Sequence, residues 1–404
     1  MRINSERTFG ELYSVIALTF VYFIGFNMLI PILPLYIVEI GASKFELGII
    51  MAILPALTIL TRLPFGFISD RLGKWLTLLS SLFMQMLAYL LFSFAPSTIY
   101  LYPAAILHAL SFASFGPISI AIALDSAQAS SRGSVMGKYY FSIGSAMILG
   151  PLLTSFLALN FEYSQILFVA SLFPLISILS FLTIQLRSSI LIQSRHLTSE
   201  LQIKQSELIP LKSIFRILRL RNVLVICIAQ ICYFTATGSF YTLFAIHAKE
   251  NLLLATSAIS ILFVISGIPN TLIRIPIGNL SDKIGRKKPL LFGYALAFFA
   301  LFSIPHMTSI FFISLLMGVY GVAWGSRTAP TAALMSDSVK SKDINLASAL
   351  IWLTSDIGMA LGSFWAGYAT IILKIPTILK ITSLSVIPGI IIILFIKERS
   401  SIRA

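Results

Sequence analysis

The chain contains the stretch TRLPFGFISDRLGK at residues 61–74 and a second version of it, IRIPIGNLSDKIGR, at residues 273–286. The two stretches lie 212 residues apart and share an Arg, a Pro, two Gly, a Ser and an Asp at matching places. The same shift superposes Asp125 on Asp337. A unit of about half the chain is therefore used twice.

Composition indicates the solvent in which this repeat folds. The chain has 404 residues, of which 57% are hydrophobic and 11% charged, and its mean hydropathy is +0.94. A soluble domain carries about 45–50% apolar and about 25% charged residues, so a soluble globular protein is excluded. The apolar runs are long and continuous, which excludes a membrane β-barrel. The net charge of +14 would suit nucleic acid, but the basic residues lie between apolar runs, as membrane topology requires.

Twelve apolar runs are long enough to cross a bilayer as helices. They lie near residues 12–37, 46–69, 75–94, 98–124, 135–158, 163–186, 222–246, 255–279, 288–306, 309–335, 344–373 and 376–396. We expect an all-α integral membrane protein with twelve transmembrane helices in two six-helix bundles. Because six is even, the two copies have the same orientation in the membrane and are parallel repeats. The predicted organisation is an N-terminal bundle at 1–186, a linker at 187–221 and a C-terminal bundle at 222–404.

The distribution of basic residues predicts the topology. With a cytoplasmic N-terminus, only four Lys or Arg residues fall on the outer side of the membrane, namely Lys44, Lys249, Lys374 and Lys380. The positive-inside rule then predicts a multi-pass protein of the cell membrane with both termini cytoplasmic. In the linker, residues 209–221 place apolar and basic side chains at helical spacing, which predicts an amphipathic helix on anionic lipid. The alternative is a solvated basic linker that only anchors the topology.

The repeated stretch carries a motif of glycines and charges. It runs Gly66-x-x-x-Asp70-Arg71-x-Gly73-Lys74, with the echo Gly278-x-x-x-Asp282-Lys283-x-Gly285-Arg286. Its glycines permit a tight turn, its Asp can cap a helix, and its Arg can pair with an acid such as Asp125. We expect a breakable latch there, formed by both copies of the motif with Asp125 and Asp337. The alternative is a plain basic turn between two spans.

With these motifs the chain resembles the major facilitator superfamily along essentially its whole length. The resemblance implies a transporter whose substrate cavity lies between the two bundles near mid-membrane. One bundle would rock on the other and open the cavity to each side in turn.

The first span resembles the signature of the twelve-span drug:proton antiporter branch of that family. It has Gly25, then five residues, then Pro31 and, after two more residues, Pro34. Prolines remove backbone hydrogen bonds, so the helix can bend and offer freed carbonyls to a cavity. The alternative is a Pro-kinked packing helix that contacts no ligand.

The fifth span resembles the antiporter signature of exporters. It carries Gly137, Gly150 and Pro151, while Ala146, Thr154 and Ser155 stand where that signature has Gly. These small residues would let the helix pack closely against a neighbour in the other half. A generic small-residue packing face is the alternative.

Two ionisable residues are predicted deep in the membrane, where a charge is expensive. Arg327 lies ten residues before Asp337, and Asp356 lies about as far into the next span, so both would have similar depth and could pair. The functional interpretation is a substrate or proton switch with Asp356 as the coupling acid, and the alternative is a permanent structural ion pair. At the 212-shifted positions stand Phe115 and Gly144, so the pair breaks the repeat.

Other polar and aromatic residues are candidates for the cavity wall. They are Tyr22, Asn27, Gln230, Tyr233, Trp324 and Trp352, for each of which packing is the alternative. His108 is a candidate proton relay in the fourth span, or a buried packing residue. Arg62 and Arg274 are expected to reach toward lipid headgroups or to support the latches.

The sequence suggests neither an enzyme nor a metal centre, since it has no Cys/His ligand spacing and no phosphate-binding loop. We expect no cofactor, a monomer, and a lipid bilayer, protons and a small-molecule substrate as partners, without nucleic acid. The first hypothesis is proton-coupled efflux of amphipathic organic compounds by alternating access. One rival is an importer or facilitator of a small organic anion or other metabolite, with Arg327 binding the anion. The other is a non-transporting sensor on a transporter scaffold.

Overall fold

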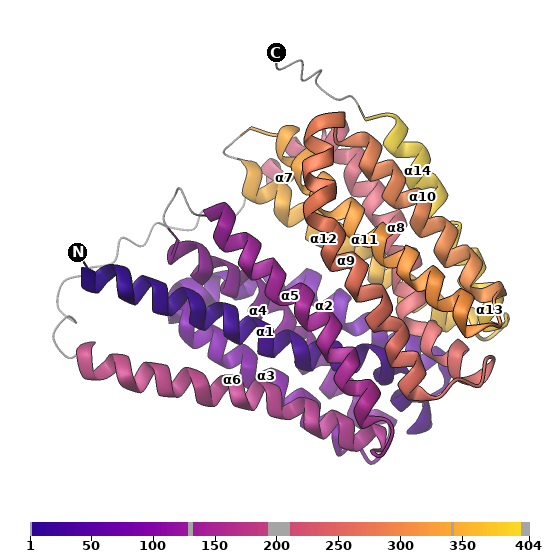
Figure 1. Cartoon of the computed structure of the whole chain (residues 1–404), viewed down its shortest axis with the longest axis horizontal. Helices are drawn as coiled ribbons and strands as arrows, with labels where there is room; N and C mark the ends of the chain where they lie inside the picture. Colours follow the sequence, from indigo (N-terminus) through magenta and orange to yellow (C-terminus); the bar gives the residue numbers. More distant parts are fainter. Residues whose placement is uncertain (1, 128–131, 193–210, 341–342, 397–404) are drawn as a thin grey trace.

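The computed structural model describes residues 2–127, 132–192, 211–340 and 343–396. Within these residues, twelve segments are long and apolar enough to cross a membrane, which confirms the predicted integral membrane protein. The helices form two bundles that meet along one side (Figure 1). The N-terminal bundle consists of α1 (Arg2–Glu39), α2 (Lys44–Leu72), α3 (Lys74–Ser93), α4 (Leu101–Asp125), α5 (Arg132–Leu157) and α6 (Tyr163–Ile192), with the short η1 (Thr98–Tyr100) before α4.

The C-terminal bundle repeats this order. It consists of α8 (Arg221–Glu250), α9 (Thr256–Ile284), α10 (Lys287–Ser303), η3 (Ile304–His306), α11 (Ile310–Asp337), α12 (Ile344–Ala369), α13 (Ile375–Ser383) and α14 (Val386–Leu394). Along the chain, α7 (Leu211–Leu218) comes between the two bundles. It lies within the stretch for which an amphipathic helix is predicted. Arg216 of α7 forms an ion pair of 2.8 Å with Asp343 at the start of α12. Residues 187–192 of the predicted linker belong instead to α6, and residues 193–210 lie outside the described residues.

The last span consists of two helices rather than one continuous helix. Pro388 lies in the first turn of α14 and has no N–H to donate to the carbonyl of Leu384, so the helix is interrupted between them. Ser385 at this break donates its hydroxyl to the carbonyl of Cys232 on α8, at 2.9 Å. This break was not predicted, although Pro388 and Gly389 mark it in the sequence.

The internal repeat is visible in the backbone as well as in the order of helices. Gly73 and Gly285, which end α2 and α9, have φ values of +89° and +92° and nearly equal ψ values. Only glycine adopts this conformation readily. The two motif turns therefore have the same geometry, as the 212-residue shift predicts.

The two bundles contact each other toward one face of the molecule. We call the face with the turns at Gly73 and Gly285 the motif face, and the opposite face, with the turns at Gly41 and Leu253, the far face. Near the far face, Lys44 of α2 and Glu250 of α8 form an ion pair of 2.6 Å between the bundles.

The same region brings backbones together. Gly48 of α2 and Gly367 of α12 are in such close contact that a Cβ on Gly48 would overlap the Cα of Gly367. Ser155 of α5 donates to the carbonyl of Ser257 on α9, at 3.0 Å. Toward the motif face the helices of the two bundles diverge (Figure 1). The structure is thus closed at its far face.

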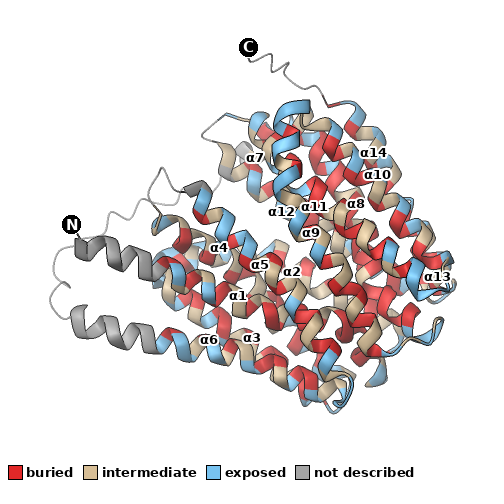
Figure 2. Ribbon diagram, viewed as in Figure 1, coloured by how far each residue is buried: buried red, intermediate tan, exposed pale blue. Residues whose placement is uncertain are grey.

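Burial follows this arrangement. Buried residues gather where helices pack within and between the bundles, and the outward faces of the helices are exposed (Figure 2). Many of those exposed side chains are large and apolar, such as Leu60, Phe94 and Phe311. An apolar outer surface is what a bilayer requires.

Candidate functional site

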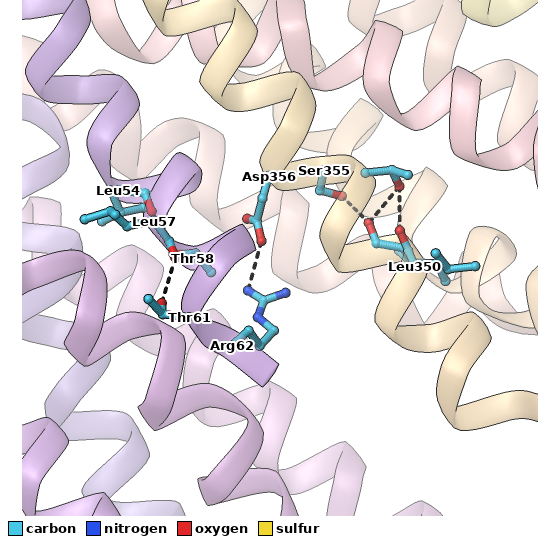
Figure 3. Close-up of polar contacts among 10 residues, drawn as sticks. Leu54, Leu57, Thr58, Thr61, Arg62, Leu350, Ser355 and Asp356 are labelled. Atoms are coloured by element: carbon cyan, nitrogen blue, oxygen red, sulfur yellow. Dashed lines mark hydrogen bonds and ion pairs between the residues drawn. The ribbon is translucent and has the colours of Figure 1, made fainter. Parts of the chain in front are cut away.

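An ion pair joins the two bundles through residues inside two of the long helices. The Nη2 atom of Arg62 on α2 lies 3.1 Å from Oδ2 of Asp356 on α12. The two side chains point toward each other across the bundle interface (Figure 3). Their exposed fractions are 20% and 8%, so a charge on Asp356 is compensated mainly by Arg62. Nearby Thr58 and Ser355 donate to carbonyls of their own helices.

This partner differs from the predicted one. Among the residues that the structure describes, the carboxylate of Asp356 pairs with Arg62 and not with Arg327, and Arg62 therefore does not reach for lipid headgroups. The spacing along each helix predicts the depth of a residue in the membrane. It does not determine the direction in which the side chain points around the helix. Arg62 and Arg327 lie at comparable depth, so spacing alone does not distinguish them as partners of Asp356.

Arg327 lies in a cluster of aromatic and amide side chains inside the C-terminal bundle. Its Nη1 atom donates to Oε1 of Gln230 at 2.7 Å. Its guanidinium carbon lies 4.2 Å from the ring centre of Tyr233 and 4.4 Å from that of Phe234. Trp324 is slightly farther, at 5.6 Å. The aromatic faces stabilise this cation, of which only 4% is exposed. Three predicted candidates, Gln230, Tyr233 and Trp324, are thus brought together with Arg327.

A small pocket lies where the bundles meet, with a volume of about 20 Å³. It is lined by Asn27, Ile30, Met147, Pro151, Tyr241, Phe263, Ser266, Gly267, Asn270 and Trp324. Its walls are helices α1 and α5 of one bundle and α8, α9 and α11 of the other. Asn27 is buried and donates its amide to the carbonyl of Phe23, at 2.7 Å.

Prolines place backbone acceptors around this pocket. Helix α1 continues through Pro31 and Pro34, and α5 through Pro151. A proline has no N–H for the carbonyl four residues before it, so the carbonyls of Asn27, Ile30 and Met147 lack their helical donors. All three residues line the pocket.

Two other candidates lie away from this pocket. Tyr22 stacks on Phe115 with ring centres 3.7 Å apart and shares a hydrogen bond with Ser111, all within the N-terminal bundle. His108 is buried there and stacks on Phe26. These contacts are those of packing residues.

Trp352 is instead 47% exposed on α12, one helical turn from Asp356. Its ring centre is 5.7 Å from the guanidinium carbon of Arg62. This ring therefore forms part of the surroundings of the inter-bundle ion pair.

The small residues of the fifth span divide their contacts between two neighbours. A Cβ on Gly150 would lie 2.7 Å from Cβ of Asn27, so Gly150 packs on α1 within its own bundle, not across the halves as expected. The contact with α9 of the other bundle is made by Gly144, against Thr271, and by Ser155. Gly25 of the first span packs on α6 through Ala170.

The motif turns form ion pairs inside each bundle. Lys74 pairs with Asp125, and at the equivalent place in the other copy Arg286 pairs with Asp337 at 3.4 Å and with Asp282. Lys74 therefore takes the partner that was expected for Arg71. Lys74 begins α3 one residue after the turn, next to the end of α4.

The remaining motif residues make few contacts in this conformation. Gly73 is the N-cap of α3, and no side chain caps that helix, so Asp70 does not have the predicted capping role. Asp70, Arg71 and Lys283 are exposed. A Cβ on Gly66 or on Gly137 would meet open space, and one on Gly278 would be in ordinary contact at 3.8 Å.

The structure adds functional candidates that the sequence analysis did not single out. Gly48 and Gly367 let the far face close, and nothing in their local sequence marks this role. Arg62 and Arg274 did carry a signal, because both copies of the repeat retain this arginine within the membrane.

Comparison with known proteins agrees with the twelve-helix architecture. A family model described as Major Facilitator Superfamily matches residues 15–363 and also residues 226–403. A protein of Methanocaldococcus jannaschii described as an uncharacterized MFS-type transporter is 24% identical over 385 residues, covering 92% of this chain and 95% of that protein. Multidrug resistance protein 2 of Bacillus subtilis is 25% identical over 303 residues, with 73% of each chain covered.

Solved structures share the fold at low sequence identity. The nucleoside transporter NupG superposes with a TM-score of 0.76 at 14% identity, covering 96% of this chain and all of that one. A bacterial homolog of the human lysosomal transporter Spinster, in an inward-facing and unoccupied conformation, gives a TM-score of 0.72 at 14% identity, with 96% and 95% covered.

Proposed function

Since this chain belongs to the Major Facilitator Superfamily and is a multi-pass membrane transporter, we propose that it exports amphipathic organic compounds by proton-coupled alternating access. The similarity to multidrug resistance proteins supports this substrate class. Aromatic and amide side chains around the pocket suit compounds that are part apolar and part polar.

The position of Asp356 carries the proposal. The other acidic side chains that the structure describes lie in turns or within two residues of a helix end, whereas Asp356 lies well inside α12. A carboxylate at this depth is costly unless paired, and its protonation removes the charge. We assign Asp356 as the residue that carries the coupling proton.

The location of its partner links protonation to movement. With Asp356 ionised, the pair with Arg62 ties α2 to α12 and so ties the two bundles together. A proton on Asp356 removes the attraction and lets the bundles move relative to each other. The ion pairs at the two motif turns are then the proposed latch elements that are rearranged when the motif face closes.

The proposed orientation places the motif face in the cytoplasm, because the motif turns and α7 are rich in basic residues. The structure then corresponds to a state in which the bundles diverge toward the cytoplasm. Amphipathic compounds would enter from that side and leave through the far face.

Flux through proteoliposomes tests this function. Purified protein is reconstituted with an imposed pH gradient, and movement of ethidium, a cationic dye, and fluorescein, an anionic dye, is followed by fluorescence. We expect at least one dye to move against its own gradient while the pH gradient lasts. Dye movement that never responds to the pH gradient would contradict proton coupling, and movement of no compound in a broad panel would favour the sensor hypothesis.

A further inference from the structure

The repeat contains an arginine whose acidic partner is missing. Arg62 and Arg274 occupy equivalent places 212 residues apart, on α2 and α9. Arg62 pairs with Asp356 across the interface with α12. The place equivalent to Asp356 is Gly144 on α5, which packs against Thr271 of α9. The second interface therefore retains the cation without the carboxylate.

The contacts of Arg274 are all with neutral groups. Its Nε and Nη2 atoms lie 3.4 and 3.2 Å from Oδ1 of Asn270, and Nη2 lies 3.9 Å from the sulfur of Met147 on α5. In the part of the chain that the structure describes, no carboxylate lies within ion-pair distance of Arg274.

The described residues within the spans at this interface therefore contain more positive than negative charge. Arg62, Arg274 and Arg327 lie inside the spans, and among the described residues Arg62 alone of these three has a carboxylate partner, Asp356. Arg274 and Arg327 lie on α9 and α11, which pack closely where Gly325 meets Ile273 and Asn270. Two cations in a poorly solvated region repel each other more strongly than they would in water, and this repulsion is relieved by an anion placed near them.

Arg274 is also next to the pocket between the bundles. Asn270 and Met147, which it contacts, both line that pocket together with Tyr241, Phe263 and Trp324. The pocket itself has room for about one water molecule. Because α9 runs toward the motif face, Arg274 lies one helical turn, about 6 Å, on the motif-face side of Asn270. A ligand that enters from the motif face would meet Arg274 before these aromatic rings.

We propose that Arg274 binds an anionic group of the transported compound and that this group takes the place which Asp356 has beside Arg62. The substrate class is then an amphipathic organic anion, with its carboxylate or similar group on Arg274 and its apolar body toward Trp324 and Tyr241. This proposal deepens the proposed export function and rests on it. Arg327 supports the site through its positive potential and contacts the aromatic wall.

Binding of three matched compounds tests the site. Cinnamate, cinnamamide and cinnamylamine share one aromatic skeleton and are anionic, neutral and cationic, and their binding to the purified full-length protein is measured by equilibrium dialysis. We expect cinnamate to bind at least about tenfold more tightly than cinnamamide and cinnamylamine. Equal binding of the three, or tightest binding of the amine, would overturn the proposal, and this comparison requires no variant.

Three variants assign the effect to Arg274. Arg274→Gln is expected to reduce the preference for cinnamate over cinnamamide to less than about twofold, while Lys374→Gln, which removes an exposed cation from the start of α13, preserves it. Met147→Glu places a carboxylate beside Arg274 and is expected to abolish the preference. An unchanged preference in Arg274→Gln and Met147→Glu, with both proteins folded, would contradict the assignment.

Failure of this proposal is distinguishable from failure of the export function. The dialysis experiment uses no membrane and no gradient, so it reports on the anion site alone. If cinnamate shows no preference but a pH gradient still drives dye flux, only the anion site is refuted. If cinnamate binds through Arg274 but no gradient drives any flux, the export function is refuted instead.

Discussion

Arg62 of α2 and Asp356 of α12 form an ion pair of 3.1 Å that joins the two halves of the molecule. A pair in this position is affected by any movement of one bundle against the other. It also contains a group that can exchange a proton. The same ion pair therefore contributes to the conformational equilibrium of the two bundles and to the proposed dependence of that equilibrium on protons.

Replacing Asp356 by Asn is expected to uncouple transport. The amide cannot carry the proton, so a pH gradient should no longer drive uphill movement of the dye, whereas exchange down the dye's own gradient should persist. Proteoliposome flux measures both. Asp343→Asn, a change of the same chemistry at the start of the same helix, serves as control and should retain gradient-driven flux. Gradient-driven flux at the original rate in Asp356→Asn would place the coupling residue elsewhere.

Removing Arg62 is expected to destabilise the protein more than removing Asp356 does. Arg62→Gln leaves a carboxylate that is 8% exposed without its partner, and breaking a buried pair in this way typically costs about 3–5 kcal/mol. The double variant Arg62→Gln with Asp356→Asn buries no charge and should recover most of the loss. Thermal unfolding of the purified proteins measures the effect, and purely additive losses in the double variant would show that the pair does not act as a unit.

Much of the fold was predictable because its signals are local and repeated. The twelve apolar runs define the spans, and the 212-residue shift predicts that Gly73 and Gly285 form equivalent turns. The pairing of Asp356 was not predictable, because spacing along α12 gives its depth but not its direction around the helix. The same limit explains why Gly150 packs within its bundle while Gly144 contacts the other one.

Contacts between backbones were also invisible in the sequence. Gly48 and Gly367 are separated by most of the chain and have no motif around them, yet they are in close contact at the far face. The repeat does carry a signal for the role of Arg274, since Arg62 is its counterpart and Gly144 stands at the place equivalent to Asp356. The sequence does not show that α2 packs against α12 while α9 packs against α5.

Enlarging Gly48 is expected to prevent closure of the far face. A valine side chain at this position would overlap the backbone of Gly367, so Gly48→Val should favour conformations in which α2 and α12 are apart there. The charged atoms of Lys44 and Glu250 lie 2.6 Å apart. Cysteines that replace these two residues should cross-link more slowly in the Gly48→Val protein than in the protein that retains Gly48.

Gly116→Ala is the matched control, because a Cβ at that position meets open space. It should leave the rate of cross-linking between positions 44 and 250 unchanged. If Gly48→Val cross-links as fast as this control, then the contact between Gly48 and Gly367 is not needed for closure.

The motif turns should be sensitive to any side chain at their glycines. Gly73→Ala and Gly285→Ala place a Cβ on backbones with φ near +90°, for which about 1–3 kcal/mol of strain is expected. Both should lower the melting temperature by similar amounts, because the turns have the same geometry. Gly66→Ala, with a helical backbone and open space around it, should have little effect on stability. A tolerated alanine at both turns would refute the need for glycine there.

Alternating access requires that the two bundles rock so that one face opens as the other closes. Distances between spin labels at Leu72 and Ile284 on the motif face, and at Ile99 and Phe311 near the far face, test it directly, since all four side chains are exposed and the residues of each pair are equivalent in the repeat. Measured by pulsed electron paramagnetic resonance across ligand and pH conditions, one distance should lengthen whenever the other shortens. Two distances that stay constant, or that change in the same direction, would contradict alternating access.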